Sequence, residues 1–153
     1  MSAGIPLTDE DRWAWLASLR DECVLRLTSA SDVVMTCSAL KKCYRDVLRT
    51  MTATETPLCQ LSASPSPLHS ASLCVRFVYL HAPEEVVTQR ALARKGHYMA
   101  AGMVHSQYSI LELPGKDECA DVIWIDATKT LDEVKQSAVT KVMQMRRRWN
   151  LAP

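Results

Sequence analysis

The sequence predicts an α/β fold in which helices cover a parallel sheet. Three short, mostly apolar runs, at 33–37, 74–80 and 122–125, alternate with segments whose apolar residues recur at helical spacing. Nearly continuous apolar runs are typical of strands that are buried on both faces, as in parallel sheets. Strands that alternate with helices indicate such a sheet. Its ligands bind beyond the carboxyl ends of the strands. The 153 residues are about one domain in length.

The first helix is predicted to begin after Thr8. Threonine is a common N-cap residue, and the acidic residues 9–11 follow it in the first turn, where carboxylates suit the helix dipole. The polar run 29–32 ends this helix and leads into the first strand, at 33–37. A second helix is expected near 40–51.

The second half of the chain is predicted to repeat this alternation. The strand at 74–80 precedes a helix that starts at Pro83 and stops at Gly96, because proline suits the first helical position and glycine the C-terminal stop. Another helix near 103–111 leads to the third strand, at 122–125.

The last helix is predicted to start after Thr130. Thr130 and Glu133 have the spacing of a capping box. The arginine triplet 146–148 lies at the end of this helix, where cations complement the dipole, and we do not interpret it as a nucleic-acid contact.

Residues 52–73 differ from the rest in composition. Half of them are Ser, Thr or Pro, without periodicity. Such a segment lacks the apolar content that offsets the entropy cost of ordering a chain. We therefore expect a disordered insert and assign it no function.

The composition argues against several classes of protein. The net charge of +1 leaves no electrostatic footprint for nucleic acid or a membrane surface. No apolar run approaches the ~20 residues of a membrane span, and no signal peptide is expected. The six cysteines have no C-x-x-C spacing. We therefore expect free thiols in a cytoplasmic protein rather than disulfides or a metal site.

Three motifs make the sequence specific. Residues 4–16 read G-I-P-L-T-D-E-D-R-W-A-W-L, residues 37–46 read C-S-A-L-K-K-C-Y-R-D, and residues 90–99 read R-A-L-A-R-K-G-H-Y-M. In this order they resemble the G-x-P-L-x-D-x-D-R-x-x-W-L, C-S-A-L-K-x-x-Y-R-D and R-x-x-x-R-x-G-H-(F/Y)-(M/F) motifs of the gluconate kinase family.

A fourth stretch extends the resemblance. Ser106-Gln107 and Leu111-Glu112 resemble the family's S-Q-x-x-x-L-E-P-P run, with Leu113 in place of the first proline. The resemblance implies a P-loop kinase fold, with three α/β/α layers around a parallel sheet. It also implies phosphorylation of D-gluconate to 6-phosphogluconate with ATP and Mg²⁺, and a homodimer is possible by the same resemblance. The insert at 52–73 departs from the family.

Basic side chains are the first candidates for the site, because a kinase mainly positions groups and stabilises charge around the transferring phosphoryl group. Arg90 and Arg94, four residues apart, are predicted to form a lid over the ATP phosphates. Lys41 and Arg45, also four apart, are predicted to hold the gluconate carboxylate or the phosphoryl group. Solvated surface charge is the alternative for both pairs.

Six further residues are candidates, and most have a structural alternative. Ser38 binds a sugar hydroxyl or caps a helix. His97 meets a phosphate or a hydroxyl, or packs beside the lid. Asp9, Asp11 and Arg12 line the polyol side of the cleft, or the two acids only complement the helix start. Gln107 is a weaker candidate near the lid. Four large side chains of this region are expected in the core rather than at a ligand: Trp13, Trp15, Met35 and Tyr44.

The 153 residues contain no G-x-x-x-x-G-K-[S/T] loop, and the four glycines are too far apart to form one. In the family this loop precedes the G-x-P-L motif, so the chain resembles a single, partial kinase domain that lacks the first two strands. The family's strand order, 2-3-1-4-5, would leave 33–37 and 75–80 beside an absent strand, with unpaired edges or paired directly. Three strands are expected, and we predict that this polypeptide does not phosphorylate gluconate.

Three interpretations stay open on sequence alone. The chain is a truncated gluconate kinase, from a gene-model fragment or an alternative start. It is a noncatalytic binding or regulatory module that keeps the acceptor and lid surfaces. Or it is a kinase for another small polyhydroxy acid.

Overall fold

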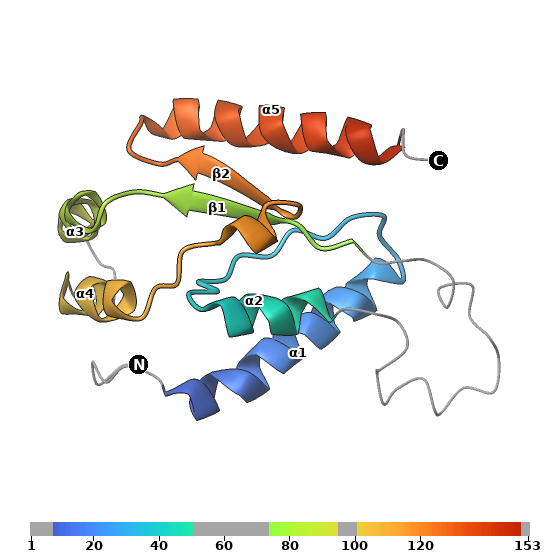
Figure 1. Cartoon of the computed structure of the whole chain (residues 1–153), viewed down its shortest axis with the longest axis horizontal. Coiled ribbons are helices and arrows are strands. Elements are labelled where there is room, and N and C mark those ends of the chain that lie inside the picture. Colours follow the sequence, from blue (N-terminus) through green and yellow to red (C-terminus); the bar gives the residue numbers. More distant parts are fainter. Residues whose placement is uncertain (1–7, 51–73, 95–100, 151–153) are drawn as a thin grey trace. The chain divides into compact units, whose positions relative to one another are not determined.

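The computed structural model describes residues 8–50, 74–94 and 101–150 (Figure 1). The chain divides into two compact units. The first contains Ile5–Val75 and Ile110–Leu113, and we refer to it as the helical unit. The second contains Arg76–Ser109 and Pro114–Pro153, and we refer to it as the sheet unit.

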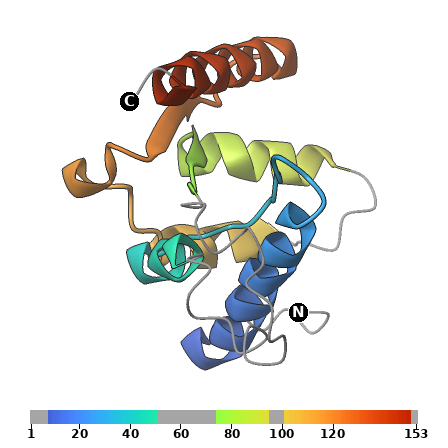
Figure 2. The same cartoon turned by 90° about the vertical axis from the view of Figure 1, so that its right-hand side faces the viewer.

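The helical unit is built on two packed helices, α1 (Asp9–Leu27) and α2 (Lys42–Arg49) (Figure 2). The prediction that α1 begins after Thr8 is confirmed. The Thr8 hydroxyl accepts a hydrogen bond from the Asp11 N–H at 3.3 Å, and the Asp11 carboxylate accepts one from the Thr8 N–H at 2.9 Å. This capping box satisfies backbone donors that a helix start leaves unpaired.

Apolar burial between the two helices forms the core of this unit. Leu16 of α1 and Leu48 of α2 are each 1% exposed, and Tyr44 is 2% exposed. A fully buried leucine stabilises a fold by roughly 1.5–3 kcal/mol relative to an exposed one. These contacts hold α2 against α1.

The predicted strand at 33–37 is wrong. The segment is neither helix nor strand, and Val34 is 93% exposed. An apolar run becomes a strand only where another segment pairs with its backbone groups. The described residues contain no such pairing for this run. Its Met35 sulfur instead lies 3.7 Å from the Cys23 sulfur of α1.

The sheet unit contains two parallel strands, β1 (Phe77–His81) and β2 (Val122–Asp126). Their register runs from Phe77 opposite Val122 to His81 opposite Asp126. The α/β class and the parallel pairing are confirmed. The sheet has two strands among the described residues instead of three, because 33–37 does not join it.

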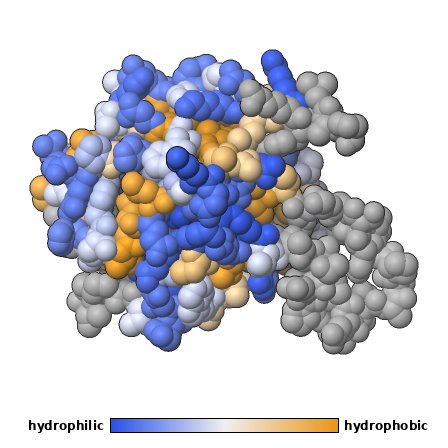
Figure 3. Space-filling model, in the orientation of Figure 1, coloured by the Kyte–Doolittle hydropathy of each residue, from blue (hydrophilic) through white to orange (hydrophobic). Residues whose placement is uncertain are grey.

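Helices flank this pair of strands in the sequence. The sheet unit also contains α3 (Glu84–Ala93), α4 (Ala101–Ser109), the short 3₁₀ helix η3 (Lys116–Glu118) and α5 (Leu131–Asn150). Helix α3 packs against α4, and α5 packs against β2. The upper part of Figure 3, where α5 lies, is mainly hydrophilic.

The start of α5 is as predicted. The Glu133 carboxylate accepts from the Thr130 N–H at 3.0 Å, and the Thr130 hydroxyl accepts from the Glu133 N–H at 3.4 Å. Pro83 is the N-cap of α3 rather than its first helical residue. Gly96 and the insert at 52–73 lie outside the described residues. In the described part of the chain, no helix combines the length and the apolar character that crossing a membrane requires.

Candidate active site

Charged side chains from α1 and α2 meet where the two helices begin. Asp9 is the first residue of α1, and Lys41 is the N-cap of α2. The Lys41 ammonium lies 2.8 Å from Asp9 Oδ1 and 2.7 Å from Oδ2. The Tyr44 hydroxyl donates to Asp9 Oδ1 at 2.5 Å. With Arg12, these residues form what we call the Asp9 cluster.

The protonation states in the Asp9 cluster follow from these contacts. Hydrogen bonds from Lys41 and from Tyr44 lower the pKa of Asp9. The hydrogen bond to Asp9 raises the pKa of Lys41. Burial, and then the bond to Asp9, raise the pKa of Tyr44. At neutral pH the cluster therefore holds a carboxylate, an ammonium and a neutral phenol.

The Tyr44 ring also contacts the cations of the cluster. The Lys41 ammonium lies 5.6 Å from the ring centroid, and the Arg12 guanidinium carbon lies 5.7 Å from it. The Trp13 ring meets the Tyr44 ring edge-on, with centroids 5.5 Å apart. Both cations are within the range of a cation–π interaction. The cluster thus combines two cations and one carboxylate around one buried ring.

Arg45, next to Tyr44 in the sequence, has a different environment. It is 3% exposed. Its Nη1 donates to the carbonyl oxygens of Ala39 at 3.0 Å, Leu40 at 3.4 Å and Glu112 at 3.1 Å. Arg45 therefore holds the main chain of the loop that leads into α2. Its role as a substrate ligand stays a prediction.

The loop that Arg45 holds contains a strained residue. Ala39 has a φ of 39°, in the left-handed region. A residue with a Cβ pays about 1–2 kcal/mol there. Such conformations persist only where surrounding contacts impose them, and they occur often at functional sites. The Arg45 bond to the Ala39 carbonyl is one of these contacts.

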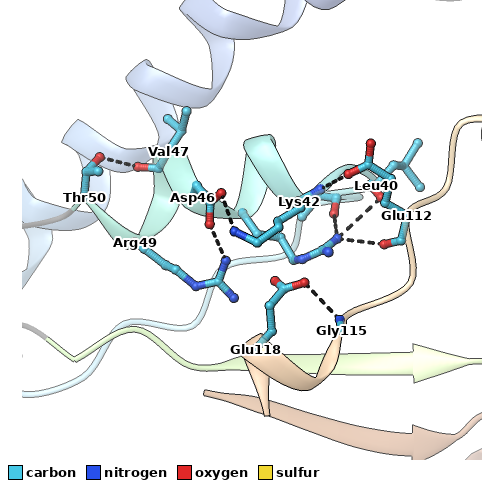
Figure 4. A network of polar contacts seen from close by, with 11 residues as sticks. Leu40, Lys42, Asp46, Val47, Arg49, Thr50, Glu112, Gly115 and Glu118 are labelled. Atoms are coloured by element: carbon cyan, nitrogen blue, oxygen red, sulfur yellow. Dashed lines mark hydrogen bonds and ion pairs between the residues drawn. The ribbon is translucent and has the colours of Figure 1, made fainter. Parts of the chain in front are cut away.

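Glu112 caps α2 from a distant part of the sequence. Its Oε2 accepts from the Lys42 N–H at 2.6 Å, and its own N–H donates to the Leu40 carbonyl at 2.9 Å (Figure 4). Lys41, although it is the N-cap, makes no side-chain cap bond. In the sequence, Glu112 stands out only as part of a motif. No local spacing could reveal this role, since 70 residues separate the two partners.

Arg90, in the sheet unit, also binds main-chain carbonyls. From α3 it donates to the carbonyl oxygens of Ala127, of Thr128 at 3.1 Å and of Lys129 at 3.1 Å. These residues follow β2. Asp126 Oδ1 accepts from the Thr128 N–H at 3.0 Å, and the hydrogen bonds from Thr128 lower the pKa of Asp126. Arg90 therefore holds the turn at the carboxyl end of β2.

The structure places the other predicted residues as follows. Ser38 is exposed in the helical unit, before α2. Arg94 is the exposed C-cap of α3, and Gln107 is half-buried on α4. His97 lies outside the described residues. The structure thus brings Asp9, Arg12 and Lys41 together in one unit, and places Arg90, Arg94 and Gln107 in the other.

The described residues show no prepared metal centre and no disulfide. They contain no group of three or more His, Cys, Asp or Glu residues that could hold a metal ion. The cysteines in the described ranges are free: Cys23, Cys37, Cys43, Cys74 and Cys119.

Similar structures define the class of this protein. The crystal structure of a gluconokinase from Sinorhizobium meliloti matches 98% of this chain and 71% of that chain, with a TM-score of 0.71 and 33% identity. A sugar kinase from Janibacter matches 94% of this chain and 70% of that chain, with a TM-score of 0.71 and 36% identity. The fold is therefore that of the P-loop sugar kinases. No family model matches the chain.

Similar sequences narrow this class to one family. A probable gluconokinase of Schizosaccharomyces pombe is 40% identical over 147 residues, which are 95% of this chain and 67% of that protein. One of Rattus norvegicus is 40% identical over 134 residues, 88% of this chain and 70% of that protein. The thermoresistant gluconokinase of Escherichia coli is 33% identical over 139 residues, 91% of this chain and 67% of that protein. The chain belongs to the gluconokinase family.

Proposed function

We propose that these 153 residues contribute to a gluconokinase, an enzyme that transfers a phosphoryl group from ATP to D-gluconate and forms 6-phospho-D-gluconate. The relatives named as gluconokinases support this activity. The free thiols fit the reducing conditions of the cytoplasm, where we place the reaction. By family resemblance, the enzyme is a homodimer.

The Asp9 cluster is the observation that carries the proposal. Gluconate has one carboxylate and a chain of hydroxyls. Lys41 and Arg12 supply positive charge for an anion, and the Asp9 carboxylate is an acceptor for hydroxyls. The side chains of Asp9 and Lys41 are 41% and 23% exposed, so a small ligand has access to both. Ser38 completes the proposed acceptor residues, and Arg45 supports them by holding the loop before α2.

We assign the nucleotide side of the reaction to the sheet unit. Arg90 and Arg94 are the proposed ligands of the ATP phosphates, with His97 and Gln107 beside them. Arg90 now bonds three main-chain carbonyls, so a phosphate ligand would have to compete with them or use its remaining donors. Arg94 is exposed at the end of α3.

The 153 residues by themselves do not provide the groups that bind ATP and Mg²⁺. The 153 residues contain no glycine-rich phosphate loop, and the described ones contain no cluster of metal ligands. We expect this polypeptide on its own to form no 6-phosphogluconate in a coupled assay, and turnover close to that of an intact kinase would contradict this.

Direct binding tests the acceptor site without turnover. Isothermal titration of the 153-residue chain with D-gluconate should give a dissociation constant at least about tenfold lower than with D-glucitol, which lacks the carboxylate. Lys41→Met should abolish most of this preference. Lys135→Met, at a side chain that is 62% exposed on α5, is the matched control and should change nothing.

The outcomes separate the remaining interpretations. Equal affinity for gluconate and glucitol, or a preference that survives Lys41→Met, would contradict the proposed site. A preference for a different sugar acid in the same titration would identify another acceptor.

A further inference from the structure

We propose that Tyr44 is a positioning residue of the gluconate site, rather than only a core residue as the sequence suggests. Its hydroxyl orients the Asp9 carboxylate, and its ring holds Lys41 and Arg12 close to that carboxylate. The inference rests on the proposed function, because it takes the Asp9 cluster as the site that binds gluconate.

Tyr44 itself has a fixed position. Its side chain is 2% exposed, on a helix that packs against α1. The Trp13 ring contacts it edge-on, with an interplanar angle of 81°. A ring that is packed in this way cannot follow a moving partner. The partner must therefore adapt to the hydroxyl.

The Asp9 carboxylate is held through both of its oxygens. A carboxylate offers about four acceptor positions. Three are used: Lys41 binds both oxygens, and the Tyr44 hydroxyl binds Oδ1. Rotation of the carboxylate out of this plane would lengthen all three contacts. The hydroxyl therefore fixes the plane in which Asp9 faces Lys41, and with it the direction of the ammonium group.

The two cations, Lys41 and Arg12, contact the same Tyr44 ring. Lys41 and Arg12 lie 5.6 and 5.7 Å from its centroid. Two like charges repel each other, and the ring face offsets part of this cost by attracting both. Loss of the ring would therefore disperse the positive charge that the proposed site offers to the gluconate carboxylate.

A structural role alone would not need the hydroxyl, and this allows a clean test. Tyr44→Phe keeps the ring and its packing and removes only the bond to Asp9. Tyr108→Phe is the matched control, since the half-buried Tyr108 also donates one hydrogen bond, to the Ala82 carbonyl at 2.8 Å. Both variants lose one tyrosine hydroxyl from a part-buried bond.

Two measurements on the 153-residue chain are compared for the two variants. In isothermal titration, Tyr44→Phe should weaken gluconate binding about tenfold, as expected for a lost bond to a charged group. It should have much less effect in an Asp9→Ala background. In a carbon-13 NMR titration, it should raise the pKa of Asp9, because the lost bond lowers that value. Tyr108→Phe should leave both unchanged.

The measurements also separate failure of this inference from failure of the proposed function. If the wild-type chain binds no gluconate, the proposed function fails, and the NMR titration alone tests Tyr44. An unchanged Asp9 titration, or an equal loss of affinity in the Asp9→Ala background, overturns the positioning role. If Tyr44→Phe does not fold, wild-type Tyr44 provides the test. The chemical shift of the ring carbon that bears its hydroxyl should change as Asp9 titrates, and an unchanged shift overturns the inference.

Discussion

The two units use charged side chains in different ways. In the helical unit, Lys41 pairs with the Asp9 carboxylate, a side chain that is 41% exposed. In the sheet unit, Arg90 bonds main-chain carbonyls after β2. An ion pair at the surface contributes little to stability. A guanidinium on several carbonyls instead fixes a loop. The first arrangement suits ligand binding, and the second suits support of a site.

Both arrangements occur within the helical unit as well. Lys41 and Arg45 are four residues apart at the start of α2, and the sequence predicts one role for both. Lys41 contacts a carboxylate at the surface, whereas Arg45 is buried on carbonyl oxygens. The following predictions test whether this division between ligand-binding and supporting cations holds.

The largest effect is expected at Arg45. Arg45→Met leaves the carbonyls of Ala39, Leu40 and Glu112 without this donor in a buried site, and should lower the free energy of unfolding by about 3 kcal/mol. Urea denaturation measures it. Arg26→Met is the control, at a side chain that is 69% exposed in an ion pair, and should cost about 0.5 kcal/mol or less. A similar cost for the two variants would remove the distinction between them.

A smaller loss of stability is expected when Arg90 is replaced. Arg90→Met should destabilise the turn after β2 by about 1–2 kcal/mol, since part of its guanidinium is exposed. Hydrogen exchange should show this as faster exchange of the Thr128 amide. Arg94→Met, at the exposed end of the same helix, is the matched control. Unchanged exchange in Arg90→Met would mean that the turn is held by the Asp126 and Thr128 contacts alone.

A gain in stability is expected at Ala39. Ala39→Gly should stabilise the chain by about 0.5–1 kcal/mol, because glycine adopts a φ of 39° without the cost of a Cβ. Ala17→Gly, inside α1, should have the opposite sign, since glycine weakens a helix interior by about 1 kcal/mol. Thermal melting compares the two. Destabilisation by both would show that the loop is not strained.

The smallest expected effect is a loss of folding stability at acid pH. The pKa values of Asp9 and Asp126 are lowered in the folded chain, chiefly by hydrogen bonds from Lys41 and from Thr128. A carboxyl with a lowered pKa stabilises the fold above its ordinary value and loses this contribution as the pH falls through the folded value. The loss therefore begins below the ordinary value of 3.8.

Substitution should remove this dependence at each site. Asp9→Asn and Asp126→Asn should each flatten the fall in urea midpoint between neutral pH and about pH 3. Asp132→Asn, at a side chain that is 94% exposed, is the control and should follow the wild type. A wild-type slope in Asp9→Asn would indicate that the pair with Lys41 adds nothing to stability.

Local patterns predicted much of the fold and part of the site. The sequence predicted the helix caps at Thr8 and Thr130. It also predicted the two parallel strands, within 74–80 and 122–125, to within a few residues. The strand at 33–37 failed because an apolar run does not reveal whether a partner strand pairs with it. The contact between Asp9 and Lys41 was not predicted, because the sequence places the two residues only in separate motifs of one family.

The sequence by itself determined the class of fold, the helix starts and the family, because these depend on residue types within one or a few turns or on whole motifs. Only the tertiary structure decided which cation binds what. Arg45 and Lys41 look alike in the sequence, but Glu112 and the loop before α2 surround one of them and Asp9 meets the other. Asp9 is 32 residues from Lys41 in the sequence, and Glu112 is 67 residues from Arg45. Burial, which local spacing does not encode, sets the strength of each contact.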